Sequence, residues 1–463
     1  MNDTSIIKRQ FFSSIKRGTG EAHLIIKNNQ ELDFSNYIIK AALTDYAYNG
    51  QVEGSRALYI SELIALSSER ERIRKAVLEA LQFERKDTWV LVQLFDLAAI
   101  FARKGDTEAR KAIYKRFYKK KIKYSHWCGY SAILDLDGLD GLKYIATIIG
   151  KFLEKKPDEV EDDAIISHFQ DDNPSINVWK KLEEASKENR YIKIYLDNIK
   201  QTHAKWENSY KRPVFNFEAL KDNIANSKVR IIGSHYTKSL STEEITILAD
   251  ELLLETDKFK IAKYLSIFSH VKFPYNYLPI LKLAKGRLNN QNRVVELAVD
   301  ALKFFSAKDI REFAIAKLRR SSSPVAYTNL LITNYKKGDA KLLKSIAEKS
   351  KSDYLIHCLA ASFIGIYTAN KTKECREPIE VIYDKTTCGE CRKEIVQLLL
   401  DNRVLSKKIL REIKHDSYEE TRELYIDQKK ERLDNSFSTA LTPLKRSLLK
   451  DFLTVGIREI IEK

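Results

Sequence analysis

The chain has 463 residues, of which 44% are hydrophobic and 31% charged, a length that allows two to four ordinary domains or one elongated repeat array. Its 15 Gly and 8 Pro are too few for a turn-rich β architecture and favour helices joined by short polar loops. The 80 basic and 64 acidic residues leave a net charge of +16, which bears on the choice of partner rather than on the fold.

The sequence also disfavours membrane proteins and disulfide-rich secreted proteins. No segment reaches the ~18 apolar residues needed to span a membrane, and Met1 to Phe12 lacks the apolar core of a signal peptide. Five cysteines in a chain of this length do not make a disulfide scaffold. We therefore expect a cytoplasmic protein with reduced thiols and no membrane association.

An apolar pattern at positions i, i+3, i+4 and i+8 recurs along the chain, and each occurrence predicts an amphipathic helix. The run Trp89 to Phe101 predicts a buried helix. In the first half the pattern begins in steps of 36 residues, at Ile73, Ala109 and Ile145. In the second half it begins every 16 or 17 residues, at Val294, Ile310, Tyr327 and Leu343. The pattern predicts an all-α fold of stacked helix pairs, which is an α-α superhelix.

One segment carries a resemblance to a known family. The sequence from Arg293 to Arg319, RVVELAVDALKFFSAKDIREFAIAKLR, resembles HEAT repeats of the short bacterial type. In it Ala298 and Ala314 are small residues inside helices that must approach closely, and Asp309 resembles the residue that opens the second helix of a pair. The resemblance implies a HEAT- or armadillo-like solenoid that binds along its groove. Tetratricopeptide repeats, which have a similar period, are the second choice.

Interruptions of the helical pattern divide the chain into four parts. We expect an N-terminal array at 1–206, a connector at 207–240, a C-terminal HEAT-like array at 241–433 and a C-terminal helix within 434–463. In the connector, Ser239 to Thr242 followed by Glu243 and Glu244 has the signature of a helix start. The amphipathic pattern from Leu441 to Ile461 predicts a helix that caps the array or, alternatively, docks a partner.

The strongest functional signal is a basic stretch between Phe101 and Ser125. Its candidate binding residues are Arg103, Arg110, Lys111, Lys115, Arg116, Lys119, Lys120 and Lys123. On a helix from Asp106 to Lys120, Lys111, Lys115 and Lys119 would form one exposed row. Such a row suits the phosphates of a nucleic acid. A solvated surface and an acidic protein partner are the alternatives.

The cysteines raise a second possibility. Cys388 and Cys391 form one CxxC pair, and His357 and Cys375 complete a set of four candidate zinc ligands. The spacing departs from that of paired zinc knuckles, however, and the cysteines begin segments that look like helix starts, where a thiol pKa can fall. Ordinary structural thiols, a zinc site and a redox pair therefore all remain open, and we expect no cofactor.

The sequence contains no GxGxxG, GxxxxGK[ST] or GxSxG pattern. We therefore expect a non-catalytic helical-repeat scaffold or adaptor that binds another macromolecule, most plausibly a protein, along its groove. The alternative is a nucleic-acid-binding solenoid that uses the basic stretch at 103–123. An enzyme of the HEAT-like DNA-glycosylase type is a further variant, because those enzymes combine a basic concave face with a carboxylate.

Overall fold

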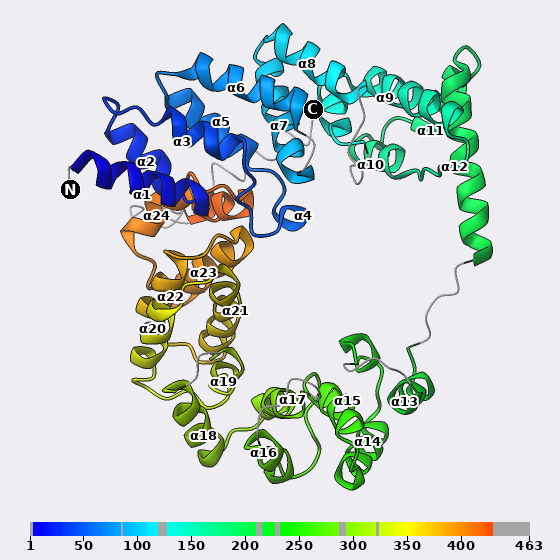
Figure 1. Cartoon of the computed structure of the whole chain (residues 1–463). Helices are drawn as coiled ribbons and strands as arrows, with labels where there is room; N and C mark the ends of the chain where they lie inside the picture. Colours follow the sequence, from blue (N-terminus) through cyan, green and yellow to red (C-terminus); the bar gives the residue numbers. More distant parts are fainter. Residues whose placement is uncertain are drawn as a thin grey trace, which may run out of the picture.

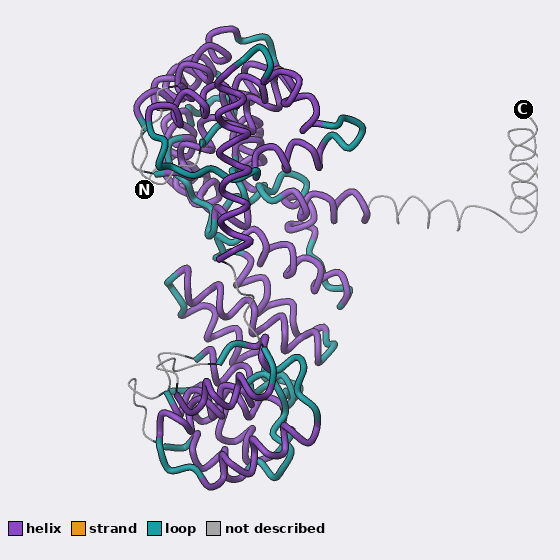
Figure 2. The backbone as a smooth tube through the Cα atoms, turned by 90° about the vertical axis from the view of Figure 1, so that its right-hand side faces the viewer, coloured by secondary structure: helices purple, strands orange, loops and turns teal. Residues whose placement is uncertain are grey.

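The fold is all-α across the part of the chain that the computed structural model describes. The described residues are 3–84, 87–118, 127–209, 215–226, 232–286, 293–320 and 324–428. Within these ranges every regular element is an α-helix or a short 3-10 helix, and none is a strand, as the colouring of Figure 2 shows. The predicted fold class is confirmed at this level. None of the described helices combines the length and apolar character that a membrane crossing requires.

The N-terminal half contains twelve α-helices in its described residues. They are α1 (Asp3–Arg17), α2 (Glu21–Asn28), α3 (Ser35–Ala42), α4 (Gly50–Glu53), α5 (Ala57–Leu66), α6 (Arg70–Phe83), α7 (Thr88–Arg103), α8 (Thr107–Tyr118), α9 (Tyr130–Lys155), α10 (Ala164–Asp172), α11 (Val178–Ser186) and α12 (Arg190–Ser209). The predicted buried helix is α7, whose inner face is almost completely shielded from solvent. Gly138, with φ of 52°, interrupts the helical geometry of α9.

The described residues of the C-terminal half form a second set of helices. They are α13 (Phe217–Asn226), α14 (Thr242–Leu254), α15 (Lys258–Phe268), α16 (Leu278–Ala284), α17 (Val294–Ala301), α18 (Lys308–Leu318), α19 (Val325–Asn329), α20 (Ala340–Lys349), α21 (Asp353–Ala369), α22 (Arg376–Tyr383), α23 (Gly389–Asp401) and α24 (Lys407–Ile413). Three 3-10 helices are η1 (Ser234–Tyr236), η2 (Leu302–Phe304) and η3 (Lys373–Cys375). Residues 419–428 are also helical.

The start of α14 shows how closely local sequence determines a helix end. The Ser241 hydroxyl accepts from the Glu244 backbone N–H, and the Glu244 carboxylate accepts from the Ser241 backbone N–H. This reciprocal capping box satisfies two backbone donors that the first turn leaves unpaired. The predicted helix start is confirmed.

Helices pack on their sequence neighbours and on the next helix but one. In the N-terminal half α5, α7 and α9 pack in succession, while α6 and α8 pack on each other beside α7. In the C-terminal half α19, α21 and α23 pack in succession, and α20 packs on α22. Alternate helices of these segments therefore form two layers.

Each half has its own buried core. One apolar cluster extends from Phe11 to Ile199, and the other extends from Leu220 to Ile413. Leu220 and Ile224 of α13 belong to the second cluster, so the segment predicted as a connector contributes a helix to the C-terminal core. The C-terminal helix expected within 434–463 lies outside the described residues.

The two ends of the described chain lie side by side. Figure 1 shows α1 and α2 next to α24, and α22 and α23 close to them. The Ser417 amide donates to the Gly18 carbonyl at 2.7 Å, and the Arg56 guanidinium donates to the carbonyl of Thr387, which is 331 residues further along the chain. The chain thus returns on itself at a junction between its first and last helices.

Candidate functional sites at the junction of the chain ends

Glycines allow the backbones of the two chain ends to approach closely. A Cβ atom at Gly20 would lie 1.9 Å from the Glu412 carbonyl oxygen, and one at Gly389 would lie 3.0 Å from the Oε2 atom of Glu53. Gly18 has φ of +76°, a conformation that other residues adopt only with strain. These three glycines therefore serve the contact between the chain ends, because a side chain at any of them would force the backbones apart or strain them.

Buried polar groups connect the same surfaces. The Glu53 carboxylate accepts from the Gly389 N–H at 3.0 Å and from the Tyr48 N–H at 2.9 Å. Arg56 donates to Glu53 at 3.3 Å and to the Lys16 carbonyl at 2.7 Å. The side chains of Arg56 and Glu53 are only 4% and 3% exposed. Because buried charges are stable only when paired, this network specifies how the two ends fit together.

The most deeply buried ion pair of the junction joins Arg392 of α23 to Asp416. Both side chains are 0% exposed, and two parallel N–H···O hydrogen bonds of 2.9 Å connect them. Arg392 also donates to the Ser417 hydroxyl at 3.0 Å, next to the Ser417–Gly18 contact. The bidentate geometry fixes the segment after α24 in the position where it meets the N-terminal helices.

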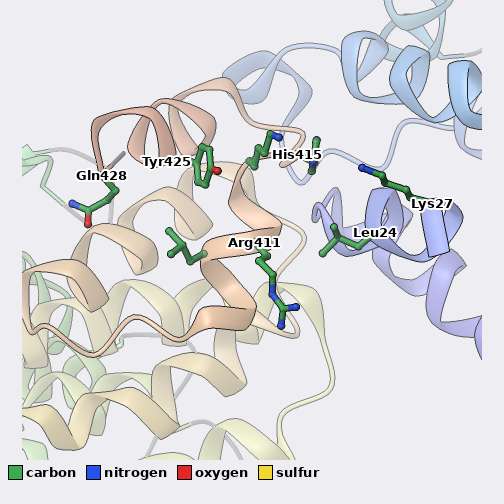
Figure 3. A pocket seen from close by; sticks show the side chains of 8 residues that line it. Leu24, Lys27, Arg411, His415, Tyr425 and Gln428 are labelled. Carbon is green, nitrogen blue, oxygen red and sulfur yellow. The ribbon is translucent and has the colours of Figure 1, made fainter. Parts of the chain in front are cut away.

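A pocket of about 330 Å³ lies between α2 and α24, beside this network. Figure 3 shows the side chains that line it, which come from both ends of the described chain. Its described lining residues are Leu24, Lys27, Leu410, Arg411, Lys414, His415, Tyr425 and Gln428. Three of these carry permanent positive charge, and none of those described carries a carboxylate. The pocket therefore combines an apolar wall with cationic groups, which suits a ligand that is partly apolar and negatively charged.

Two histidines lie at this pocket, which His415 lines. The rings of His23 and His415 stack in parallel with centroids 3.7 Å apart. Burial lowers the pKa of His23, and burial together with nearby positive groups lowers the pKa of His415 to about 4. Both rings are therefore neutral near pH 7, so the positive charge of the pocket comes from Lys27, Arg411 and Lys414.

A second cluster lies where α21 and α23 meet. The donor atoms of His357, Cys388 and Cys391 all lie within 4.8 Å of one another. The Cys391 Sγ is 3.2 Å from the His357 Nδ1. The ring of Tyr48, from the N-terminal half, stacks on His357 with centroids 4.3 Å apart. The two thiols differ in acidity, because a hydrogen bond from Cys391 lowers the pKa of Cys388 and raises that of Cys391.

The cluster brings together three of the four zinc ligands considered from the sequence. Cys375 precedes α22, as predicted. The helix predicted to begin at Cys391 begins two residues earlier, because Cys388 caps α23 and Cys391 lies in its first turn. Cys375, however, is fully buried in the C-terminal core and is not part of the cluster. Burial raises the pKa of its thiol to about 11. The four-ligand set is therefore corrected to His357, Cys388 and Cys391.

The basic stretch is less available than its sequence suggests. Arg103 lies 3.8 Å from Asp135, and Arg110 pairs with Asp137, so α9 supplies counter-charges to both. Arg116, one of the candidate binding residues, is 6% exposed and donates to the Glu84 carbonyl at 2.9 Å, so it is not presented to a partner. Lys111 and Lys115 are exposed as predicted. Lys119, Lys120 and Lys123 lie outside the described residues.

Neither family models nor curated proteins give a match to this sequence. The residues of the junction are far apart in the sequence and follow no periodic pattern, so no local pattern connects them. The one sequence feature that could have indicated the junction is the position of certain glycines in a chain that has only 15 of them. Gly18 and Gly20 lie two residues apart, and Gly389 lies inside the CxxC pair.

Proposed function

We propose that the protein is a non-catalytic scaffold that binds an acidic, partly apolar segment of another protein in the pocket between α2 and α24. The observation that carries this proposal is the composition of the pocket: Lys27, Arg411 and Lys414 surround a wall that includes Leu24 and Leu410. Carboxylates of a partner would pair with the cations, and an apolar side chain would cover the leucines.

The architecture proposed with this function is a HEAT-like α-α superhelix. Helices that pack on the next helix but one, in two layers, are typical of stacked helical repeats, and α5, α7 and α9 pack in this way. A repeat scaffold of this kind presents a rigid framework on which a binding pocket keeps its shape without ligand.

A protein segment suits the pocket better than a nucleic acid does. A nucleic-acid backbone requires a track of cations along its path, whereas the pocket gathers its cations within about 330 Å³. Arg103, at the end of α7, and Arg110, on α8, are exposed but already pair with carboxylates of α9. Lys111 and Lys115 are the remaining exposed candidates among the described residues. The basic surface of α8 is therefore a weaker site for phosphates.

The proposal is tested by affinity capture with three forms of the full chain. The wild type is compared with a pocket variant, Lys27→Glu with Lys414→Glu, and with a matched surface variant, Lys111→Glu with Lys115→Glu. Both variants change net charge by the same amount at exposed lysines. Captured proteins are identified by mass spectrometry, and binding to labelled single- and double-stranded DNA and RNA is measured at two salt concentrations.

We expect a protein that the wild type and the surface variant capture and the pocket variant loses. Binding of the purified partner should weaken with salt, because charge pairs contribute to it. The proposal is wrong if all three forms capture the same proteins. Tight nucleic-acid binding that the surface variant alone loses would establish the alternative function instead.

A further inference from the structure

The cluster of His357, Cys388 and Cys391 has the donor set and spacing of a metal site. Cys388 is the residue before α23, and Cys391 lies in the first turn of that helix. His357 belongs to the facing helix α21. Two sulfur donors and one imidazole nitrogen within 4.8 Å of one another form a soft ligand set, which favours Zn²⁺ over Mg²⁺ or Ca²⁺.

The geometry fits tetrahedral zinc closely. Zinc bonds of about 2.3 Å to sulfur and about 2.0–2.1 Å to nitrogen place a sulfur and a nitrogen ligand roughly 3.6 Å apart at the tetrahedral angle. The Cys391 Sγ and the His357 Nδ1 are 3.2 Å apart. A shift of a few tenths of an ångström would bring them to the spacing that a zinc ion requires.

We propose that His357, Cys388 and Cys391 bind one Zn²⁺ ion, with a water molecule in the fourth position. The thiolates would supply two negative charges, and the ion would join α21 to α23. The two sulfurs are brought together by the start of α23: Cys388 is its N-cap residue and Cys391 lies in its first turn, and the Cys388 Sγ accepts from the Cys391 N–H.

The surroundings of the cluster would support a bound ion. The Cys391 N–H lies 3.4 Å from the Cys388 Sγ, which it hydrogen-bonds, and such outer contacts orient thiolate ligands. Tyr48 stacks on the His357 ring and so restricts the orientation of the imidazole. Because Tyr48 belongs to the N-terminal half and contacts the ligand His357, the ion would also stabilise the junction between the chain ends.

The experiment is a metal analysis of the full-length protein purified under reducing conditions. We expect about one zinc per chain in the wild type and a loss of that zinc in Cys391→Ser. Cys128→Ser, which changes a thiol remote from the cluster in the sequence, should keep it. Cys375→Ala should also keep it, because Cys375 is outside the cluster.

A second measurement covers the case in which Cys391→Ser does not fold. The wild type is stripped with a chelator under reducing conditions and titrated with Co²⁺, which should give thiolate-to-cobalt charge-transfer absorption at one equivalent. Zinc-free folded protein that fails to bind Co²⁺ would overturn the proposal, as would a Cys388–Cys391 disulfide that survives purification under reducing conditions. Loss of zinc in Cys375→Ala would overturn the three-residue ligand set.

Discussion

Removal of the Asp416 carboxylate charge should destabilise the protein strongly. In Asp416→Asn the Arg392 guanidinium stays fully buried but loses its counter-charge and one of the two hydrogen bonds of 2.9 Å, because the amide keeps only one acceptor oxygen. Breaking a buried pair by removing one partner costs about 3–5 kcal/mol, because the remaining charge is left without compensation. We expect a loss of this size in the free energy of unfolding.

A control variant shows whether the cost comes from the burial of the ion pair or only from the loss of a carboxylate charge. Asp384 pairs with Lys408 at 2.6 Å, but the side chains of this pair are 48% and 50% exposed. Asp384→Asn makes the same chemical change at an exposed pair, for which about 0–1 kcal/mol is expected. The assay is urea unfolding followed by circular dichroism, together with hydrogen exchange of the Ser417 amide. Equal losses of unfolding free energy in the two variants, or a loss below about 1 kcal/mol in Asp416→Asn, would show that burial of the Arg392–Asp416 pair does not determine the cost.

Two further variants test the junction. Gly20→Ala should lower the melting temperature and cost about 1–3 kcal/mol of folding free energy, because its Cβ would lie 1.9 Å from the Glu412 carbonyl oxygen. The control Gly365→Ala, whose Cβ would have its nearest contact at 3.4 Å, should be neutral or stabilising. Equal effects of the two substitutions would contradict a steric clash at Gly20. Burial raises the pKa of Glu412 from 4.5 to about 7, so the folded state binds this proton more tightly than the unfolded state does. The stability that the protonated carboxyl group contributes, about 3 kcal/mol, therefore declines as pH rises from 4.5 to 7. In Glu412→Gln this contribution is absent, so the free energy of unfolding of the wild type relative to the variant should fall by about 3 kcal/mol between pH 4.5 and 7. His23 and His415, whose pKa values are lowered, are present in both proteins, so their effect cancels in this difference. A difference that stays constant with pH would show that Glu412 is not the group that titrates.

Local features of the fold follow from the sequence because their causes are local. The helical period around Ile73 and Ile145 places both residues in the core with 0% exposure, and the Ser241–Glu244 capping box is visible in four consecutive residues. Such patterns depend on residues one or two turns apart, so they need no knowledge of distant contacts.

The candidate sites depend on contacts that no local pattern contains. The pocket requires Lys27 and Lys414 to meet, although they lie at opposite ends of the described chain. The burial of Arg116, a candidate binding residue, is not visible in the local sequence because its partner, the Glu84 carbonyl, lies 32 residues away. Cys375 shares its residue type with the zinc candidates, but the helix it precedes packs into the core instead. Composition identifies candidate residues, whereas tertiary packing decides which of them meet.

The two ends of the described chain meet and build the pocket together. Cross-linking of the purified wild type with a short amine-reactive reagent tests this arrangement most directly, because Lys27 and Lys414 both line the pocket. We predict an abundant intramolecular Lys27–Lys414 cross-link that persists on dilution. Absence of this cross-link, while exposed lysines within each half still cross-link, would contradict the account.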